Sequence, residues 1–149
     1  MPTGLSYELH KLTARLDRAA DGLLRSREGV SYSRFLALFA VSEGAASQRE
    51  LAGWLGQTEP STSRMVGVLA AQGLLTATTV AGAGNRRWLK LTENGSELVD
   101  RCGRLLEGSF EDLVTRSGVS YAAYQRHTRR MLSRLDADQH APSESREAA

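Results

Sequence analysis

The residues best suited to bind an anion lie near the middle of this chain of 149 residues. Ser61, Thr62, Ser63 and Arg64 follow one another directly, and the pair Arg86 and Arg87 comes later in the sequence. Hydroxyl and guanidinium groups donate hydrogen bonds to negatively charged or carbonyl oxygens. These residues therefore predict a surface that contacts an anionic partner.

The distribution of charge supports such a surface more than the total does. The net charge is only +2. Residues 57–91, however, hold four basic residues against one acidic residue, Glu59, whereas residues 92–115 hold two basic residues against six acidic ones. A basic segment followed by an acidic one predicts a single anion-facing surface.

Residues that could support catalysis or metal binding are few and scattered. The three histidines are His10, His127 and His140, and Cys102 is the one cysteine. No serine or cysteine has a base at the spacing of a known motif, and these residues form no spaced set of metal ligands. We therefore expect no enzyme, no metal and no cofactor. A redox sensor that acts through Cys102 stays open as an alternative, although a cysteine on an apolar helix face is usually inert.

The location of the chain is predicted from what its sequence lacks. No run approaches the roughly 18 consecutive apolar residues of a membrane helix. The first residues show no basic region followed by an apolar stretch, which a secretory signal needs. We expect a cytoplasmic protein without a membrane partner.

Apolar spacing and capping residues predict six helices. The first helix, over residues 5–27, carries apolar residues spaced alternately four and three positions apart. Such a stripe favours packing against a partner helix over packing within its own domain. Ser31, Ser47 and Thr58 are the expected N-caps of the next three helices, which bury Phe39 and Val68 among other apolar residues. The last two helices are expected at about 93–116 and 120–135, and residues 137–149 as a disordered tail.

Two short strands separate the fourth helix from the fifth. Residues 74–80 and 86–92 are rich in threonine, valine, tryptophan and leucine, and a glycine-rich segment joins them. Two helices joined by a short turn and followed by a hairpin form a winged helix. The predicted fold class is mostly α with a small β-hairpin wing.

The chain resembles the MarR family of winged helix-turn-helix regulators over roughly residues 5–135. The segment from Gln48 to Gly56 resembles the first helix of the family's helix-turn-helix. The segment from Ser61 to Val66, followed by Leu69 and by Gly73-Leu74-Leu75, resembles the recognition helix and its exit. Leu91-Thr92-Glu93-Asn94-Gly95 resembles the Leu-Thr-x-x-Gly sequence that closes the wing. Each motif alone is moderately specific for the family, and their order and spacing together are highly specific for it.

The resemblance implies a bacterial transcription regulator that binds double-stranded DNA. A recognition helix enters the major groove by its N-terminal end, where hydroxyl side chains and Arg64 meet bases or phosphates. Glu59 is unexpected there, because a carboxylate repels DNA, and it is expected to stabilise the helix start instead. The expected DNA-binding residues are Gln48, Ser61, Thr62, Ser63, Arg64, Asn85, Arg86 and Arg87.

The wing departs from the family pattern. The family's wing tip usually carries Asp-x-Arg, in which the aspartate orients the arginine. Here the two positions hold Ala83 and Asn85 in one register and Asn85 and Arg87 in the other, so the aspartate is missing. We expect Arg86 and Arg87 to contact the minor groove or phosphates from a flexible glycine-rich tip.

The resemblance also implies an assembly and an effector. Residues 1–30 and 93–136 are expected to form the dimerisation helices of a homodimer, and residues 31–92 the DNA-binding domain. A two-fold protein reads a pseudo-palindromic operator, and repression is the expected outcome. A small aromatic or phenolic effector would release the DNA, and its candidate lining residues, each of which core packing also explains, are His10, Tyr32, Phe35 and Trp54. A winged-helix module that binds protein instead of DNA stays open as an alternative.

Overall fold

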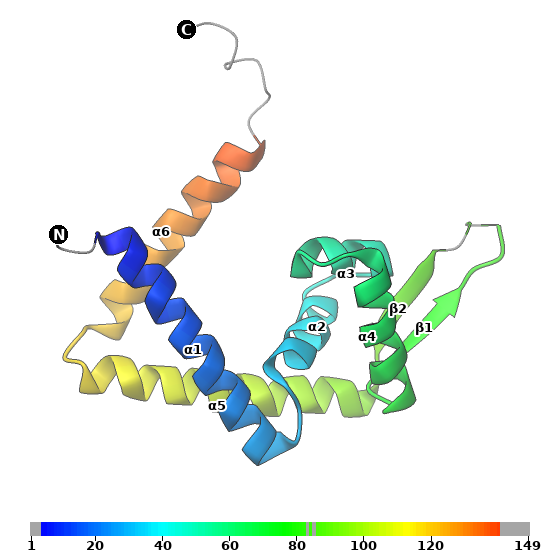
Figure 1. Cartoon of the computed structure of the whole chain (residues 1–149), viewed down its shortest axis with the longest axis horizontal. Helices are drawn as coiled ribbons and strands as arrows, with labels where there is room; N and C mark the ends of the chain where they lie inside the picture. The colour runs from blue at the N-terminus through cyan, green and yellow to red at the C-terminus, as the bar shows by residue number, and fades with distance from the viewer. Residues whose placement is uncertain (1–3, 83, 85, 141–149) are drawn as a thin grey trace, which may run out of the picture. The chain divides into compact units, whose positions relative to one another are not determined.

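The computed structural model describes residues 4–82, 84 and 86–140. The chain forms two compact units that divide between Leu106 and Glu107. The first unit holds, in chain order, α1 (Leu5–Glu28), α2 (Tyr32–Ser42), α3 (Gln48–Leu55), α4 (Glu59–Ala71), β1 (Leu75–Thr79), β2 (Arg87–Leu91) and the first part of α5 (Glu93–Arg116), as Figure 1 shows. The second unit holds the end of α5 and α6 (Tyr121–His140).

Capping residues define the starts of α2, α3 and α4. The side chains of Ser31, Ser47 and Thr58 each accept a hydrogen bond from the backbone N–H three residues later, at 3.2, 3.2 and 3.3 Å. Gly73 follows α4 with a φ of 70°, a conformation that other residues rarely adopt. The expected caps and the expected bounds of α3 and α5 are confirmed.

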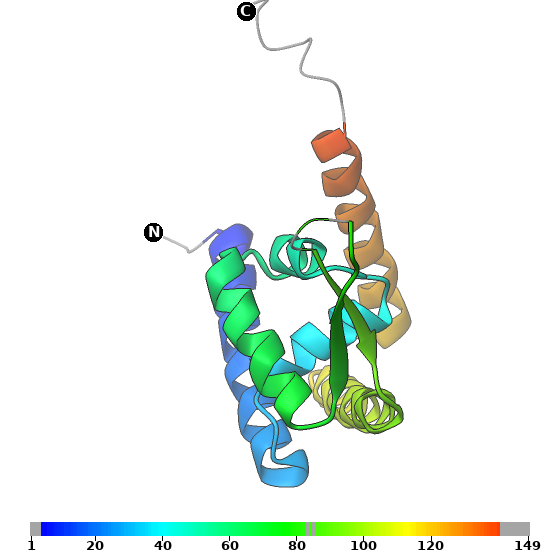
Figure 2. The same ribbon diagram turned by 90° about the vertical axis from the view of Figure 1, so that its right-hand side faces the viewer.

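The hairpin is tied to the start of α3. Its strands are antiparallel, with Leu75 opposite Leu91 and Thr79 opposite Arg87, and β1 packs against α4 (Figure 2). Ser47 forms an isolated bridge with Trp88, and the N–H of Leu89 donates to the carbonyl of Ala46 at 2.8 Å. The base of the wing is therefore fixed to the residues that cap α3.

One apolar core holds the first unit together. Every helix and both strands of the unit contribute to it, and its fully buried side chains include Leu24, Leu38, Leu51, Val66, Leu69 and Cys102. The expected mostly α winged-helix fold is confirmed.

Two side chains expected in this core are not there. Phe39 is 40% exposed and Val68 is 39% exposed. Successive helical residues are turned by about 100°, so Val68 lies on the other side of α4 from the buried Val66. Phe39 instead stacks on the ring of Phe35 at the edge of the core, with a centroid distance of 5.8 Å.

In the second unit, α6 is longer than the apolar pattern predicts. It continues past Leu135 to His140, and an ion pair of 3.2 Å between Arg134 and Asp138 spans one turn of this extension. Residues 137–140 are therefore helical, which corrects the expected start of the tail. Residues 141–149 lie outside the described part of the chain. No helix among the described residues is both long and apolar enough to cross a membrane.

Candidate nucleic-acid interface

The first turn of α4 presents polar side chains at the surface. Ser61 and Ser63 are half-buried, and Arg64 is exposed. Thr58 caps the helix, and Pro60 occupies a position in the first turn where no backbone donor is lost. The exposed turn therefore offers hydroxyl groups, a guanidinium group and the positive end of the helix dipole, although the Ser61 N–H is already bonded to Thr58 Oγ1.

Thr62 does not belong to this surface, which corrects its expected DNA contact. Its side chain is fully buried, and its hydroxyl donates to the carbonyl of Thr58 at 3.0 Å. The hydroxyl thus bonds within the helix, as threonine side chains often do.

A groove brings the first turn of α4 together with α3 and the wing. It has a volume of about 470 Å³ and lies entirely within the first unit. Its lining residues are Ser47, Gln48, Arg49, Glu59, Pro60, Ser63, Arg86 and Arg87. Three guanidinium groups against one carboxylate make the groove positively charged. Four of the residues expected at the interface line it, namely Gln48, Ser63, Arg86 and Arg87.

The two wing arginines differ in their surroundings. Arg86 is exposed, whereas Arg87 is half-buried and its Nη1 donates to Oε1 of Gln48 at 3.4 Å. The expectation for Asn85 falls on a residue outside the described part of the chain.

Arg49 and Glu59 complete the charges of the groove. The sequence reasoning missed Arg49, although its place inside the cap sequence Ser47-Gln48-Arg49-Glu50 put it on the first turn of α3. Glu59 is exposed at the first turn of α4, and no ion pair of it occurs among the described residues. Its place in the first turn of α4 is the one in which a carboxylate is expected to stabilise the positive end of the helix dipole.

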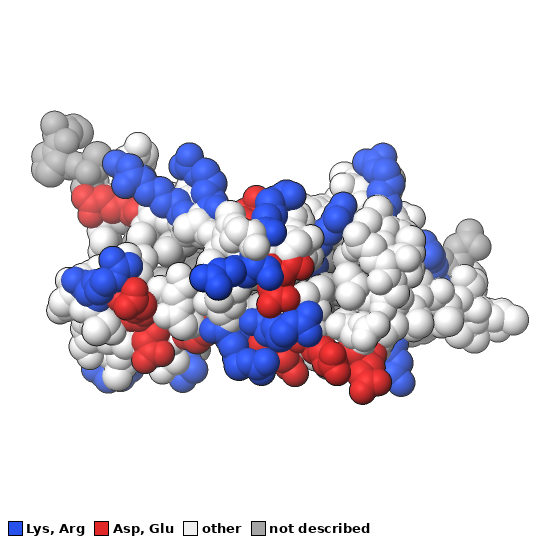
Figure 3. Space-filling model, turned by 90° about the horizontal axis from the view of Figure 1, so that it is seen from below, with Lys and Arg blue, Asp and Glu red and all other residues white. Residues whose placement is uncertain are grey.

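Not every face of the molecule carries charge of one sign. On the face in Figure 3, acidic and basic side chains are interspersed over the surface. Such a face repels and attracts a polyanion at once, so it offers no continuous attraction. The excess of arginine in the groove is therefore not shared by this face.

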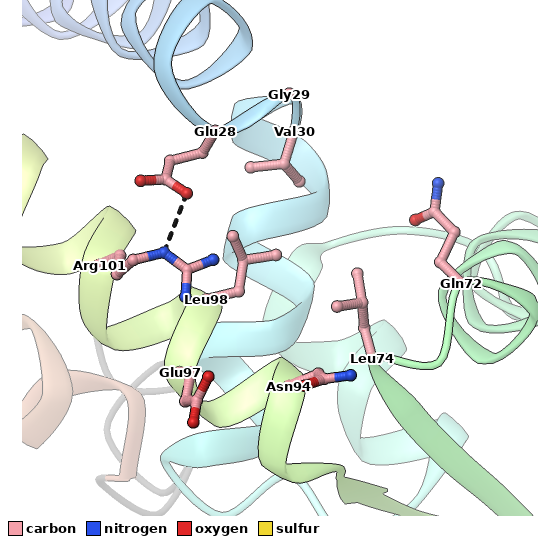
Figure 4. A pocket seen from close by; sticks show the side chains of 9 residues that line it. All are labelled: Glu28, Gly29, Val30, Gln72, Leu74, Asn94, Glu97, Leu98 and Arg101. Atoms are coloured by element: carbon pink, nitrogen blue, oxygen red, sulfur yellow. Dashed lines mark hydrogen bonds and ion pairs between the residues drawn. The ribbon is translucent and has the colours of Figure 1, made fainter.

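A second cavity of about 320 Å³ lies on another part of the first unit (Figure 4). An ion pair of 3.1 Å between Glu28 and Arg101 joins the end of α1 to α5 at its rim, and Val30, Leu74 and Leu98 contribute apolar side chains. Its lining residues come from α1, α5 and the segments that connect the elements of this unit.

The four expected effector residues do not line the two cavities described above. Tyr32 and Phe35 stack at a centroid distance of 6.3 Å, and Phe35 is buried in the core. His10 is exposed on α1, and Trp54 is 57% exposed on α3. Burial raises the pKa of Tyr32, with a smaller contribution from Asp17. The structure brings together two of the four residues, and it places them in or beside the core.

Cys102 is fully buried within α5. Burial raises the pKa of its thiol, the nearby Glu28 carboxylate raises it further, and Arg101 opposes the change. The reactive thiolate is therefore disfavoured. The described residues contain no cluster of three or more histidine, cysteine or acidic side chains that could hold a metal ion.

Comparison with known proteins agrees with this geometry. The model of the MarR family matches residues 28–87, which contain α2, α3, α4, β1 and the start of β2. No curated protein sequence matches the chain.

Solved structures extend the similarity beyond the matched segment. A cysteine-to-serine mutant of MarR from Escherichia coli is 18% identical, with a TM-score of 0.75 over 91% of this chain and 98% of that one. A complex of Staphylococcus aureus MepR with DNA is 19% identical, with a TM-score of 0.69 over the same shares. A Mycobacterium tuberculosis MarR family protein in complex with salicylic acid is 24% identical, with a TM-score of 0.66 over 89% of this chain and 96% of that one.

These findings confirm the resemblance inferred from the sequence. The fold is that of the MarR-family winged-helix regulators, and the segment that carries the candidate interface is the one that the family model matches.

Proposed function

We propose that the protein is a transcription regulator that binds double-stranded DNA sequence-specifically as a homodimer and acts as a repressor. The observation that carries the proposal is the exposed first turn of α4, where Arg64 reaches solvent beside a groove that contains Arg49, Arg86 and Arg87. A helix with a polar N-terminal turn fits the major groove, and arginine is the side chain most often used to read guanine there. The structural similarity to a MepR–DNA complex supports the same assignment.

The homodimer is proposed from apolar side chains that the single chain leaves exposed. Leu5 and Leu12 on α1 are exposed, and so are Met131, Leu132 and Leu135 on α6. Leucines at helical spacing on an exposed face indicate a surface that another molecule covers. A second copy of the chain supplies the two-fold symmetry that a pseudo-palindromic operator requires.

Selection of bound sequences from random duplex DNA tests the proposal. We expect an enriched inverted repeat whose half-site centres lie about one helical turn apart. Arg64→Ala should weaken binding of the selected duplex and relax the preference at one position of each half-site, at a cost of about 1–3 kcal/mol. Arg86→Ala should weaken all sequences alike. If the protein retains no duplex above background, DNA binding is refuted.

Release of DNA by a small aromatic or phenolic effector is part of the proposal, supported by the similar structure that holds salicylic acid. Gel-shift titrations of the selected duplex with salicylate and with benzoate provide the test. Loss of the shifted band at millimolar ligand supports an effector of this class. An unchanged band up to that concentration would refute the effector.

Two other functions receive less support. A redox sensor needs an accessible thiolate, whereas Cys102 is fully buried with a raised thiol pKa. A winged-helix module that binds only protein would need an acidic partner surface opposite the three arginines of the groove.

A further inference from the structure

The wing arginine Arg87 and the amide of Gln48 form a contact that the sequence pattern did not predict. We infer that Gln48 is a positioning residue that holds the Arg87 guanidinium over the groove between α3, α4 and β2, and that this groove seats a backbone phosphate of DNA. The inference rests on the proposed function and specifies how the wing takes part in it.

The contact joins two anchored parts of the backbone. Gln48 follows Ser47, and Arg87 precedes Trp88, and these two neighbours form the isolated bridge between the start of α3 and β2. The backbone bond from Leu89 to Ala46, at 2.8 Å, lies directly beside it. The side-chain hydrogen bond of 3.4 Å therefore adds to backbone contacts that already join α3 to β2. The backbone position of Arg87 does not depend on the conformation of the wing tip.

A glutamine suits this role because its amide oxygen is a neutral acceptor. It occupies one of the five N–H donors of the guanidinium and leaves the positive charge uncompensated. A carboxylate in the same place would form an ion pair and cancel part of the charge that attracts DNA. This geometry also explains how the wing can lack the Asp-x-Arg sequence of the family, since the acceptor lies on α3.

The groove has the composition of a phosphate site. Arg49, Arg86 and Arg87 outnumber the carboxylate of Glu59, and the half-buried hydroxyl of Ser63 adds a neutral donor. The starts of both α3 and α4 contribute to its wall, and the positive ends of their helix dipoles favour an anion. Arg64 remains outside the groove and is free to contact bases.

The test is a double-mutant cycle on the full-length protein with a duplex selected as above. Binding of Gln48→Ala, Arg87→Ala, the double variant and Gln48→Glu is measured by fluorescence anisotropy over a series of salt concentrations. Gln48→Met is a second variant, of similar shape and without the acceptor, and Gln139→Ala on an exposed turn of α6 is the matched control. Thermal unfolding of each variant confirms that it is folded.

We expect Arg87→Ala to reduce the slope of log affinity against log salt by about 1, the loss of one phosphate contact. Gln48→Ala and Gln48→Met should weaken binding by about threefold to tenfold, as expected for one hydrogen bond, and should have no further effect when Arg87 is already alanine. Gln48→Glu should reduce the salt slope, whereas Gln139→Ala should change nothing.

The outcomes separate this inference from the function on which it rests. If Gln48→Ala changes the DNA affinity equally with and without Arg87, the positioning role of Gln48 is overturned. If Arg87→Ala leaves the salt slope unchanged, the binding of a phosphate in the groove is overturned. Both results leave DNA binding intact. Failure of the unaltered protein to bind any selected duplex would instead refute the proposed function, and this inference with it.

Discussion

Arg64 and Arg87 are residues of one type in two different environments. Arg64 is exposed, and no hydrogen bond of its side chain occurs among the described residues, so its guanidinium can follow the edge of a base. Arg87 is half-buried and oriented by Gln48. An oriented guanidinium loses less conformational entropy on binding. Under the proposed function, we expect Arg64 to determine sequence preference and Arg87 to add sequence-independent affinity.

At the same scale, the environment of Cys102 predicts its reactivity. Burial in the core, then the Glu28 carboxylate, raise the pKa of the thiol, so the thiolate fraction at neutral pH is smaller than for a free cysteine. We expect labelling of the folded protein by a maleimide or by a disulfide reagent to be at least about a hundredfold slower than labelling in denaturant, because labelling then requires local opening. Rapid labelling of the native protein would contradict this and would restore the redox alternative.

Residue roles were predictable from sequence only where the determining contacts are local. The hydroxyl run Ser61 to Ser63 does not by itself tell which member turns inward, and Thr62 proved to be the buried one. The signal was the spacing, since Thr62 lies four residues before the buried Val66 and seven before the buried Leu69, on one helix face. The bond between Gln48 and Arg87 joins residues 39 positions apart. No spacing rule predicts such a pair.

The elements were more predictable than these contacts, because caps and glycines act over a few residues. The bounds of α3 and α5 are as expected, and the strands are one residue shorter at each end. The predicted end of α6 was wrong because its last turn lacks large apolar residues and is supported by polar contacts, such as the ion pair of Arg134 with Asp138.

The junction between β1 and α5 depends on one glycine. A Cβ atom on Gly95 would lie 1.8 Å from the carbonyl oxygen of Leu74, and that carbonyl already accepts from the N–H of Thr92 at 3.2 Å. Gly103, on the same helix, has open space around it. We expect Gly95→Ala to destabilise the protein by about 1–3 kcal/mol or more through overpacking.

Gly103→Ala is the matched control and should stabilise the protein by up to about 1 kcal/mol, because alanine is the better helix former. Urea unfolding followed by circular dichroism measures both changes. A Gly95→Ala variant as stable as the unaltered protein would show that α5 does not approach the Leu74 carbonyl this closely.

Asp21 connects α1 with the start of α2. Its carboxylate accepts from the backbone N–H of Tyr32 at 2.9 Å and pairs with Arg25 at 2.8 Å, and these contacts, in that order, lower the pKa of Asp21 below 3.8. A lowered pKa in the folded state means that the stabilisation is present above about pH 4 and is lost as the pH falls through the folded-state value.

Asp21→Ala should therefore lower the melting temperature at pH 7, and the difference from the unaltered protein should shrink in more acidic solution, below about pH 4. Asp112→Ala is the matched control, since Asp112 forms a similar pair with Arg116 at 2.8 Å within a single helix. We expect a smaller change for Asp112→Ala. Equal changes for the two variants would show that the bond to Tyr32 contributes nothing.

At the scale of the whole molecule, a net charge of +2 cannot by itself hold a polyanion. Under the proposed function, the affinity must come from the local charge of the groove and from Arg64 outside it. Two copies of the chain on one duplex would use these groups twice. Two linked sites bind far more tightly than one, provided that both can engage together. Disruption of the assembly should therefore weaken operator binding even where the interface itself is unaltered.

Leu135→Arg on α6 tests this link between assembly and binding. Leu135 is 58% exposed in the single chain, and a guanidinium in an apolar interface would be desolvated without a partner. We expect a dimer for the unaltered protein and a monomer for Leu135→Arg at micromolar concentration in analytical ultracentrifugation, with a loss of affinity for the full operator of about a hundredfold.

Ser133→Arg adds the same charge about 160° around the same helix, where Ser133 is exposed, and should leave both the assembly and operator binding unchanged. Binding to a single half-site separates the two effects, because Leu135→Arg should retain the weak half-site affinity of one copy. A Leu135→Arg protein that stays dimeric would show that the exposed face of α6 is not the surface through which two copies associate.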